Sequence, residues 1–339
     1  MKNQEKIFVI GHKNPDTDSI CSAIAYCDIK NRTTQESRYI PKRAGQINEE
    51  TEYVLNRFGV HPPGYLSNIG TQVKDMDIRL SPEANKSMSL KNAWDLMQEN
   101  SIVSLPIREK DGTLEGLITI GDIAKTYMDT TDSYLLSRAR TQYQRIAETI
   151  GGKVIEGNAH GYFIQGKIMV ATANPDKMKE YVEENDMVIM GNREEDHLQA
   201  IEQNVSCIIV GMGIEVTEKV LKLAHEKDIV IISSPYDTFT ISRLINQSIP
   251  VKYIMKTDNL VTFNTEDFTD DIQEVMIKHR HRAFPVINKK GKCIGTISRR
   301  NFLDMHRKKV VLVDHNEKSQ AVDNIDKADI MEIIDHHKL

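Results

Sequence analysis

The sequence predicts an α/β protein in which a parallel-sheet domain is interrupted by further α/β units. Three observations support this fold class. Short apolar strands at both ends of the chain finish in histidine and aspartate, a gapless repeat recurs in the interior, and the stretch between the two copies alternates strand and helix patterns. A chain of 339 residues is long enough for roughly two to four domains.

Composition excludes several classes of protein. Apolar residues make up 40% and charged residues 27% of the chain, with a formal charge of −5, which argues against non-specific nucleic-acid binding. No apolar stretch approaches the roughly 20 residues that a membrane helix needs, and the N-terminal MKNQEKIFVI lacks the apolar core of a signal peptide. We therefore expect a cytoplasmic protein with no nucleic-acid or membrane partner.

The interior contains a repeat. Residues 105–122 align without a gap on residues 284–301, at a constant offset of 179. Both copies share an apolar-Pro-apolar start, and Gly112 and Gly291 occupy the same turn position. Each copy has the pattern helix, strand, glycine turn, strand, helix. Two such units are expected to pack together across a pseudo-two-fold axis.

These units resemble CBS domains, whose characteristic pattern runs here from Pro106 to Asp122 and from Pro285 to Asn301. The resemblance implies that an adenine nucleotide (AMP, ADP or ATP) binds between the copies as a regulator. Asn301 departs from the family's usual aspartate. The alternative is that Asp122 and Asn301 only cap helices and that the basic run is a solvated edge. The candidate nucleotide contacts are Thr119, Asp122, Arg280, His281, Arg282, Ser298 and Asn301.

A third unit lies between the copies. GNREEDHLQAIEQNVSCIIVGMG and IISSPYDTFTISRLI, within residues 191–245, resemble the DRTGG domain, a family with no established catalytic chemistry to transfer. Gly211-Met212-Gly213 follows a strand, but so short a glycine motif is weak evidence for a phosphate loop. A structural turn or a dimer contact is the favoured interpretation.

Polar residues follow three apolar strands near the chain ends. His12, Asp16 and Asp18 follow the strand at 6–10, and a helix should begin after them with Asp18 or Ser19 as its N-cap. DHNE follows the strand at 309–313, and DHH follows the strand at 331–334. If these strands are neighbours in one parallel sheet, their ends gather a site for Mn²⁺, Co²⁺, Fe²⁺ or Zn²⁺. The ligands suffice for two ions about 3.5–4 Å apart.

The three motifs GHKNPDTDSI, VLVDHNE and IIDHHK resemble those of DHH phosphoesterases, and in particular family II, manganese-dependent inorganic pyrophosphatases. The resemblance implies hydrolysis of pyrophosphate with Mn²⁺ or Co²⁺, with Mg²⁺ as a possible additional ion. It implies that His12 and Asp16 bind one metal, that Asp18 and His336 bind the other, and that Asp314 bridges both. Asp314 and His337 are the expected catalytic residues, with His337 as general acid or as an electrostatic partner of the substrate.

The motifs imply an insertion between two parts of the catalytic domain, with junctions near 61–70 and 306–309. The chain resembles a C-terminally truncated member, because the family continues into a substrate-binding domain after DHH. A homodimer is also implied. The alternatives are a non-catalytic adenine-nucleotide sensor with vestigial metal ligands, and another DHH phosphoesterase. The expected segments are 1–66 and 308–339 (catalytic), 67–130 and 250–307 (CBS), and 131–249 (DRTGG-like).

Overall fold

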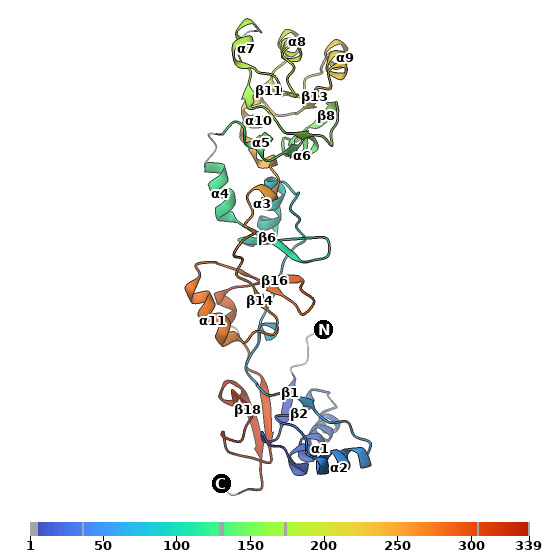
Figure 1. Cartoon of the computed structure of the whole chain (residues 1–339), viewed down its shortest axis with the longest axis vertical. Helices are drawn as coiled ribbons and strands as arrows, with labels where there is room; N and C mark the ends of the chain where they lie inside the picture. Colours follow the sequence, from blue (N-terminus) through green and yellow to red (C-terminus); the bar gives the residue numbers. More distant parts are fainter. Residues whose placement is uncertain (1–5, 36, 129–131, 173–174, 304, 338–339) are drawn as a thin grey trace. The chain divides into compact units, whose positions relative to one another are not determined.

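The structure is a computed structural model that describes residues 6–35, 37–128, 132–172, 175–303 and 305–337 (Figure 1). The chain divides into two compact units. The first contains residues 1–79, 263–289 and 296–339, and the second contains residues 80–262 and 290–295. The expected boundary at residues 130 and 131 lies outside the described residues.

A five-stranded parallel sheet forms the base of the first unit, in the order β18-β17-β1-β2-β3. Strand β17 lies between β1 and β18, so the three strands that end in His and Asp are adjacent and parallel. This confirms the predicted α/β parallel-sheet fold. The strands are β1 (Ile7–Ile10), β2 (Tyr39–Arg43), β3 (Gly64–Tyr65), β17 (Lys309–Val313) and β18 (Asp329–Ile334).

The two faces of this sheet have different cover. Helix α1 (Thr17–Thr34) buries Ala23 and Cys27 against the face formed by Val9 and its neighbours. The opposite face packs against the loop before β18, which includes the 3-10 turn η5 (Ile325–Lys327). Helix α2 (Glu49–Arg57) contacts α1, and the 3-10 turn η1 (Val73–Asp75) follows β3.

Strand β18 is the edge of the sheet and is exposed along its whole length. Among the described residues, no strand pairs with its outer side. Its apolar side chains point to both faces and are between 43% and 50% exposed; they are Ile330, Met331, Ile333 and Ile334. Glu332 is hydrogen-bonded to Tyr26 and Lys30 of α1, which fastens this edge strand to the helix.

The start of α1 differs from the prediction. The N-cap is Asp16, and neither Asp18 nor Ser19 has this role. Asp16 has extended backbone angles, and its Oδ1 accepts a hydrogen bond from the Ser19 backbone N–H at 2.9 Å. An N-cap needs a non-helical backbone, whereas Asp18 already lies in the first turn. The helix therefore begins earlier, and its cap is one of the predicted metal ligands.

The first unit also holds most of the second repeat copy: β14 (Phe263–Asn264), α11 (Thr269–Lys278), β15 (Phe284–Ile287) and β16 (Cys293–Ile297), with β4 (Arg79–Leu80) in the same sheet. The expected closing helix is wrong for this copy. Among the described residues only the 3-10 turn η4 (Arg299–Phe302) forms. Arg299, which occupies the position of Ile120 in the first copy, donates to the carbonyl of Met276 in the last turn of α11 and to those of His279 and His281 after the helix.

In the second unit, the first repeat copy has the predicted order of elements. Helix α3 (Leu90–Glu99) is followed by β5 (Ser104–Arg108), a turn at Gly112 with a φ of 91°, β6 (Leu114–Thr119) and α4 (Ile120–Met128). Strands β5 and β6 pair antiparallel. Met97, Leu105 and Ile118 are fully buried in the core that this copy shares with the next domain.

The rest of the second unit is a sheet in the order β10-β11-β12-β13-β8, parallel except for β8. Its strands are β8 (Lys153–Glu156), β10 (Ile168–Val170), β11 (Met187–Met190), β12 (Cys207–Val210) and β13 (Val230–Ser233), with the short pair β7 (Thr141–Gln142) and β9 (Tyr162–Phe163) beside them. Its helices are α5 (Leu135–Arg138), α6 (Tyr143–Thr149), α7 (Pro175–Tyr181), α8 (Glu194–Glu202), α9 (Glu218–Glu226) and α10 (Thr238–Leu244), followed by the 3-10 turns η2 (Ile245–Ser248) and η3 (Val251–Tyr253).

The glycine motif of this domain is a turn. Met212 and Gly213 both have a φ of 63°. Their backbone N–H groups donate to the carbonyls of Tyr236 and Ser234 at 2.7 and 2.8 Å. The two amides are therefore used within the fold and are not presented to a phosphate.

Within the described ranges, no helix is long and apolar enough to cross a membrane.

Candidate metal centre

Asp314 occupies the first position after β17 and lies at the centre of the candidate site. Its φ is 61°, a left-handed conformation that aspartate tolerates better than most residues and that costs of the order of 1–3 kcal/mol. Its backbone N–H donates to the Ile334 carbonyl at 2.9 Å. Its side chain is only 4% exposed. The carboxylate is therefore held rigidly between the ends of the neighbouring strands.

One group of ligand-type atoms joins the loop after β1 to Asp314. His12 Nε2 lies 3.3 Å from Asp314 Oδ2 and 3.8 Å from Asp16 Oδ1. One ligand atom from each of these three residues lies within 4.8 Å of the others. This separation would let a single divalent ion contact all three side chains.

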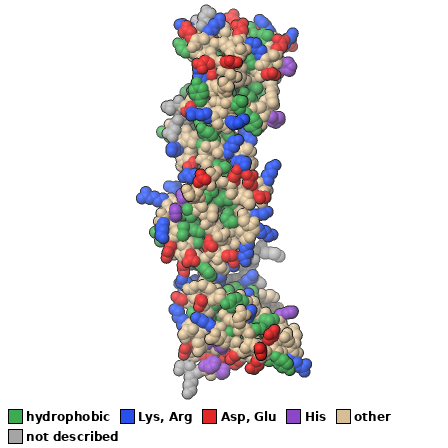
Figure 2. Space-filling view, in the orientation of Figure 1, with side chains coloured by type: hydrophobic (Ala, Val, Ile, Leu, Met, Phe, Trp, Pro, Cys, Tyr) green, Lys and Arg blue, Asp and Glu red, His purple; other side chains and the backbone are tan. Residues whose placement is uncertain are grey.

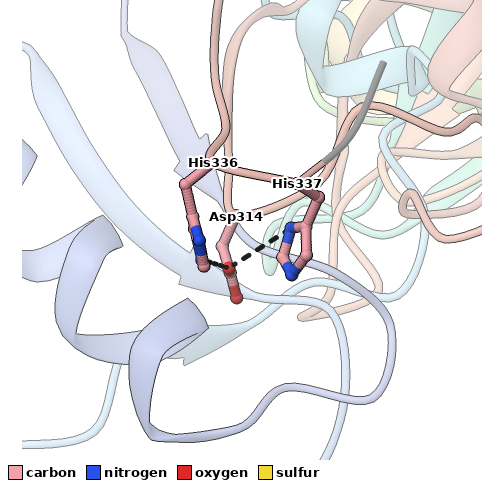
Figure 3. A group of neighbouring side chains, drawn as sticks. All are labelled: Asp314, His336 and His337. Atoms are coloured by element: carbon pink, nitrogen blue, oxygen red, sulfur yellow. Dashed lines mark hydrogen bonds and ion pairs between the residues drawn. The ribbon is translucent and has the colours of Figure 1, made fainter.

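A second group lies on the other side of Asp314. His336 Nε2 is 3.3 Å from Asp314 Oδ1 and 3.2 Å from Asp18 Oδ2. His337 Nδ1 lies 3.9 Å from the same Asp314 oxygen. Figure 3 shows the two imidazoles on either side of the carboxylate, and Figure 2 shows histidines gathered where the strands of this unit finish. The structure thus brings together all six residues predicted from the three motifs.

Unpartnered buried atoms support a bound cation. Asp314 Oδ2 and Asp335 Oδ2 are buried without a hydrogen-bond partner among the described residues. A carboxylate oxygen buried in this way is costly unless a cation or donor satisfies it. The surrounding imidazole and carboxylate donors are those that Mn²⁺, Co²⁺ or Zn²⁺ accept. The residues present therefore fit a two-ion centre.

His315 and Asp335 belong to this site but were missed as site residues. His315 is buried, and its Nδ1 contacts the Val313 carbonyl at 2.9 Å, while its Nε2 is buried without a partner among the described residues. Its ring meets that of His12 edge to face, with centroids 6.4 Å apart. Both residues lie inside the DHNE and DHH motifs, so their position was a usable signal.

The pKa values of two histidines of the site, His315 and His337, are shifted in opposite directions. Burial lowers the pKa of His315, and the neighbouring His12 adds to the effect. The exposed His337 imidazole is hydrogen-bonded through Nδ1 to Asp335 Oδ1 at 2.7 Å, and this hydrogen bond raises the pKa of His337. His315 is therefore suited to stay neutral, and His337 to hold a proton.

A cavity of about 410 Å³ opens beside the cluster. His12, Asp314 and His337 line it together with Lys13, the lysine of the first motif. Lys13 is 43% exposed at its side chain and lies 3.2 Å from Asp323. A small anion fits in this space, and Lys13 would neutralise part of its charge.

The predicted nucleotide residues are arranged alike in the two copies, each within its own unit. Asp122 Oδ2 accepts hydrogen bonds from the Thr119 backbone N–H at 2.9 Å and hydroxyl at 2.6 Å. Asn301 Oδ1 accepts from the same two groups of Ser298, at 2.7 and 2.9 Å. Asp122 Oδ1 remains within 3.7 Å of Lys256. Both residues lie inside the first turn and accept hydrogen bonds from the residue that precedes it, so neither is the N-cap that the alternative interpretation expected. A role in nucleotide binding stays a prediction.

The basic run before β15 is exposed. Arg280 and Arg282 are solvent-accessible, and the rings of His279 and His281 stack with centroids 5.8 Å apart. His281 also meets Phe284 edge to face at 5.9 Å. The run can therefore offer cations and a supported imidazole to a ligand.

Comparison with known families identifies the domains of the insertion. Residues 77–129 and 251–308 match the CBS domain, and residues 145–248 match the DRTGG domain. A crystal structure of the CBS and DRTGG domains of the regulatory region of Clostridium perfringens pyrophosphatase, complexed with its activator diadenosine tetraphosphate, superposes with a TM-score of 0.64 and 34% sequence identity. It covers 68% of this chain, and this chain covers 100% of it.

The remaining motifs also have relatives. A cobalt-dependent inorganic pyrophosphatase of Clostridium perfringens is 38% identical over 337 residues, and a probable manganese-dependent inorganic pyrophosphatase of Thermotoga maritima is 32% identical over 339 residues. These alignments cover 99% and 100% of this chain. The parallel sheet with its three motifs and the inserted domains define a chain with a candidate metal centre and a CBS and DRTGG regulatory region. The chain belongs to the metal-dependent inorganic pyrophosphatase family, in the branch that carries CBS and DRTGG domains.

The chain spans 61% and 62% of the length of these two relatives. Its match includes the three motif-bearing strands and the whole regulatory region.

Proposed function

We propose that this chain carries the two-metal centre and the regulatory region of an inorganic pyrophosphatase that hydrolyses pyrophosphate to two phosphates. The observation that supports this most directly is the position of Asp314. Its two carboxylate oxygens face separate groups, one with His12 and Asp16 and the other with Asp18 and His336. A buried carboxylate shared in this way is the bridging ligand that a pair of ions requires.

Mn²⁺ or Co²⁺ in this centre would neutralise phosphate oxygens and make a bound water acidic at neutral pH. In the proposal, His12 and Asp16 hold one ion, Asp18 and His336 hold the other, and Asp314 orients both. The chain's own groups then bind and protonate the substrate. Lys13 neutralises the phosphate in the adjoining cavity, and His337, kept protonated by Asp335, donates a proton to the departing phosphate.

The Asp314→Asn variant tests this proposal. Asparagine keeps the side-chain shape and tolerates positive φ, but it removes the charge that both ions share. We expect its Co²⁺ affinity to fall by at least about 100-fold while its thermal unfolding stays close to that of the unmodified chain. Titration of the visible absorption of bound Co²⁺ measures the affinity. Asp326→Asn is the matched control, because Asp326 lies on an exposed turn and its ion-pair partner among the described residues is Lys318, at 3.6 Å.

Phosphate release from pyrophosphate tests the chemistry. The assay uses Mn²⁺ or Co²⁺ with this chain, and with the longer product of its reading frame if the frame continues. Activity that depends on metal and on Asp314 supports the proposal. Metal-dependent activity that survives in Asp314→Asn would contradict the shared-ligand centre.

We also propose that adenine nucleotides regulate the activity by binding at the CBS domains. The support is the relationship to a regulatory region that was crystallised with diadenosine tetraphosphate. Calorimetric titration with AMP, ATP and diadenosine tetraphosphate should detect binding, and Arg280→Gln together with Arg282→Gln should weaken it. Lys219→Gln together with Lys222→Gln, on the exposed side of α9, is the control. Absence of heat with all three ligands would reject the regulatory role.

Oligomeric state and location are further parts of the proposal. A homodimer in the cytoplasm is expected from the family resemblance and from the composition. Sedimentation at several protein concentrations tests the dimer, and fractionation of cells that express the protein tests its location.

A further inference from the structure

A large basic cavity lies beside the same sheet and reaches the starts of strands whose ends carry the metal centre. Its volume is about 1420 Å³, and its lining comes entirely from the first unit. It includes residues from the starts of β1, β17 and β18 and, farther along the sheet, Lys42 of β2 and Tyr65 of β3, whereas Asp314 and the DHH motif follow the ends of β17 and β18. The length of β17 separates Lys309 from Asp314 by about 16 Å, at roughly 3.3 Å per residue.

The charge of this lining is strongly positive. Two carboxylates, Asp75 and Asp329, face seven basic side chains. The basic side chains are Lys6, Lys42, Lys74, His306, Arg307, Lys308 and Lys309. Like charges gathered around one concavity raise the local concentration of anions and favour their binding.

Several of these cations are not neutralised by the protein. Among the described residues, Lys6, Lys42 and Arg307 form no ion pair. Lys42 Nζ lies 5.8 Å from the centre of the Phe8 ring, a contact that holds the ammonium in place without a counter-charge. Lys74 differs, because its Nζ pairs with Glu266 at 2.8 Å.

The cavity also lies where the chain enters and leaves the insertion. Gln72, Lys74 and Asp75 belong to the segment that leads into the insertion, the first crossing, and residues 306–308 belong to the segment that leads back from it, the second crossing. Lys308 Nζ ties the two together, since it lies 3.0 Å from Asp75 Oδ2 and donates to the Gly70 carbonyl at 2.9 Å. An anion bound here would contact both crossings and the starts of the strands at the same time.

From this geometry we infer a second anion site in the first unit, separate from the metal centre and specific for a polyphosphate group. Its volume exceeds the roughly 300–1,000 Å³ of common ligand pockets, so a single phosphate would leave most of it empty. The cations come from β2, from β17, from the residue before β1 and from the two segments that join the insertion, which suits several linked phosphates. The group can belong to inorganic polyphosphate or to a nucleoside polyphosphate.

Lysine footprinting tests the site on the unmodified chain. The metal-free protein is acetylated in the presence of EDTA, with tripolyphosphate or ATP as the probe, and the modified lysines are found by mass spectrometry. Both probes should protect Lys6 and Lys42 and leave Lys219 and Lys222 on α9 unprotected. Protection by ATP alone, or of Lys278 alone, would overturn the assignment to a polyphosphate group in this cavity.

Calorimetry on variants gives the second measurement. Lys42→Gln combined with Arg307→Gln should weaken tripolyphosphate binding by roughly tenfold or more, and the effect should shrink at high salt. The matched control is Lys219→Gln combined with Lys222→Gln, which keeps the same net charge. Equal affinity in the two double variants, or no binding by the unmodified chain at millimolar tripolyphosphate, contradicts the inference.

Discussion

Gly11 connects β1 to the loop that carries His12, and the backbone there passes very close to α1. A Cβ at this position would lie 1.8 Å from Ser19 Oγ. The same hydroxyl accepts a hydrogen bond from the His12 backbone N–H at 3.1 Å. The loop can therefore present His12 only because residue 11 has no side chain.

We expect Gly11→Ala to lower the free energy of unfolding by about 1–3 kcal/mol, since the added methyl group must displace α1 or the loop. Thermal or denaturant unfolding of the metal-free chain measures the change. Gly191→Ala is the control, because among the described residues nothing lies within 4 Å of a Cβ built there. An equal effect in both variants would mean that close packing is not the reason for Gly11.

His315 makes stability depend on pH. Burial lowers the pKa of its folded state below the usual value of 6.5, so the unfolded chain takes up a proton at a higher pH than the folded chain does. The contribution to stability is complete above about pH 6.5 and decreases as the pH falls from there toward the folded-state pKa.

The metal-free chain should therefore lose stability between about pH 7 and pH 5, and His315→Gln should show a weaker dependence over this range. Denaturant unfolding at a series of pH values measures it. His61→Gln, at an exposed loop position, should leave the dependence unchanged. Parallel curves for the unmodified chain and His315→Gln would exclude this histidine as the cause.

At the scale of elements, the edge strand β18 depends on its contact with α1. Glu332 Oε1 lies 3.0 Å from Lys30 Nζ, and its other oxygen accepts from the Tyr26 hydroxyl. In the sequence, Glu332 lies 302 positions from Lys30 and 306 positions from Tyr26. The contact holds the strand whose end delivers Asp335, His336 and His337 to the centre.

We expect Glu332→Ala to increase local opening of β18 by a factor of roughly two to five, the effect of losing up to about 1 kcal/mol from a partly exposed pair. Hydrogen exchange of residues 329–334 measures the opening, and Co²⁺ affinity should decrease with it. Glu52→Ala on α2, an exposed residue, is the control. Unchanged exchange in β18 would show that backbone pairing with β17 alone holds the strand.

Sequence patterns predicted the elements well where burial alone determines them. The strand at 309–313 has the predicted ends, and three apolar strands with polar ends proved to be neighbours. The patterns failed at helix starts, where the hydrogen bonds of one side chain decide whether and where the helix begins. Asp16 rather than Asp18 caps α1 because it has the extended backbone, and Arg299 binds the carbonyls after α11 where Ile120 of the first copy starts a helix.

The candidate site was predictable in its membership but not in its geometry. His12, Asp16, Asp18, Asp314 and His336 could be named from three motifs. The left-handed backbone of Asp314 and the contact of its two oxygens with opposite groups could not, because they depend on how distant segments pack. His315 was overlooked although it lies inside the DHNE motif, because its burial and its unpartnered nitrogen depend on how distant segments pack.

For the whole molecule, the division into two compact units predicts independent responses to metal. The candidate ligands all belong to the first unit, and the DRTGG domain belongs to the second. Co²⁺ at 100 times its dissociation constant should stabilise the first unit by about 2.7 kcal/mol.

Differential scanning calorimetry with Co²⁺ and with EDTA checks this. One unfolding transition should move to higher temperature with metal, while the other stays in place. Asp314→Asn should abolish the movement. A shift of both transitions by the same amount would indicate that the units unfold as one cooperative body.

The open outer side of β18 has a practical consequence for handling the protein. Within the part of the chain that the structure describes, no strand pairs with this edge. Its outward N–H and C=O groups, flanked by Ile330, Met331, Ile333 and Ile334, form a template on which another extended segment can hydrogen-bond. Glu332 is the charged residue within this stretch, and its carboxylate is already engaged with α1. Concentrated solutions of this chain are therefore prone to edge-to-edge aggregation, and a lysine introduced at Met331 would be the simplest means of suppressing it.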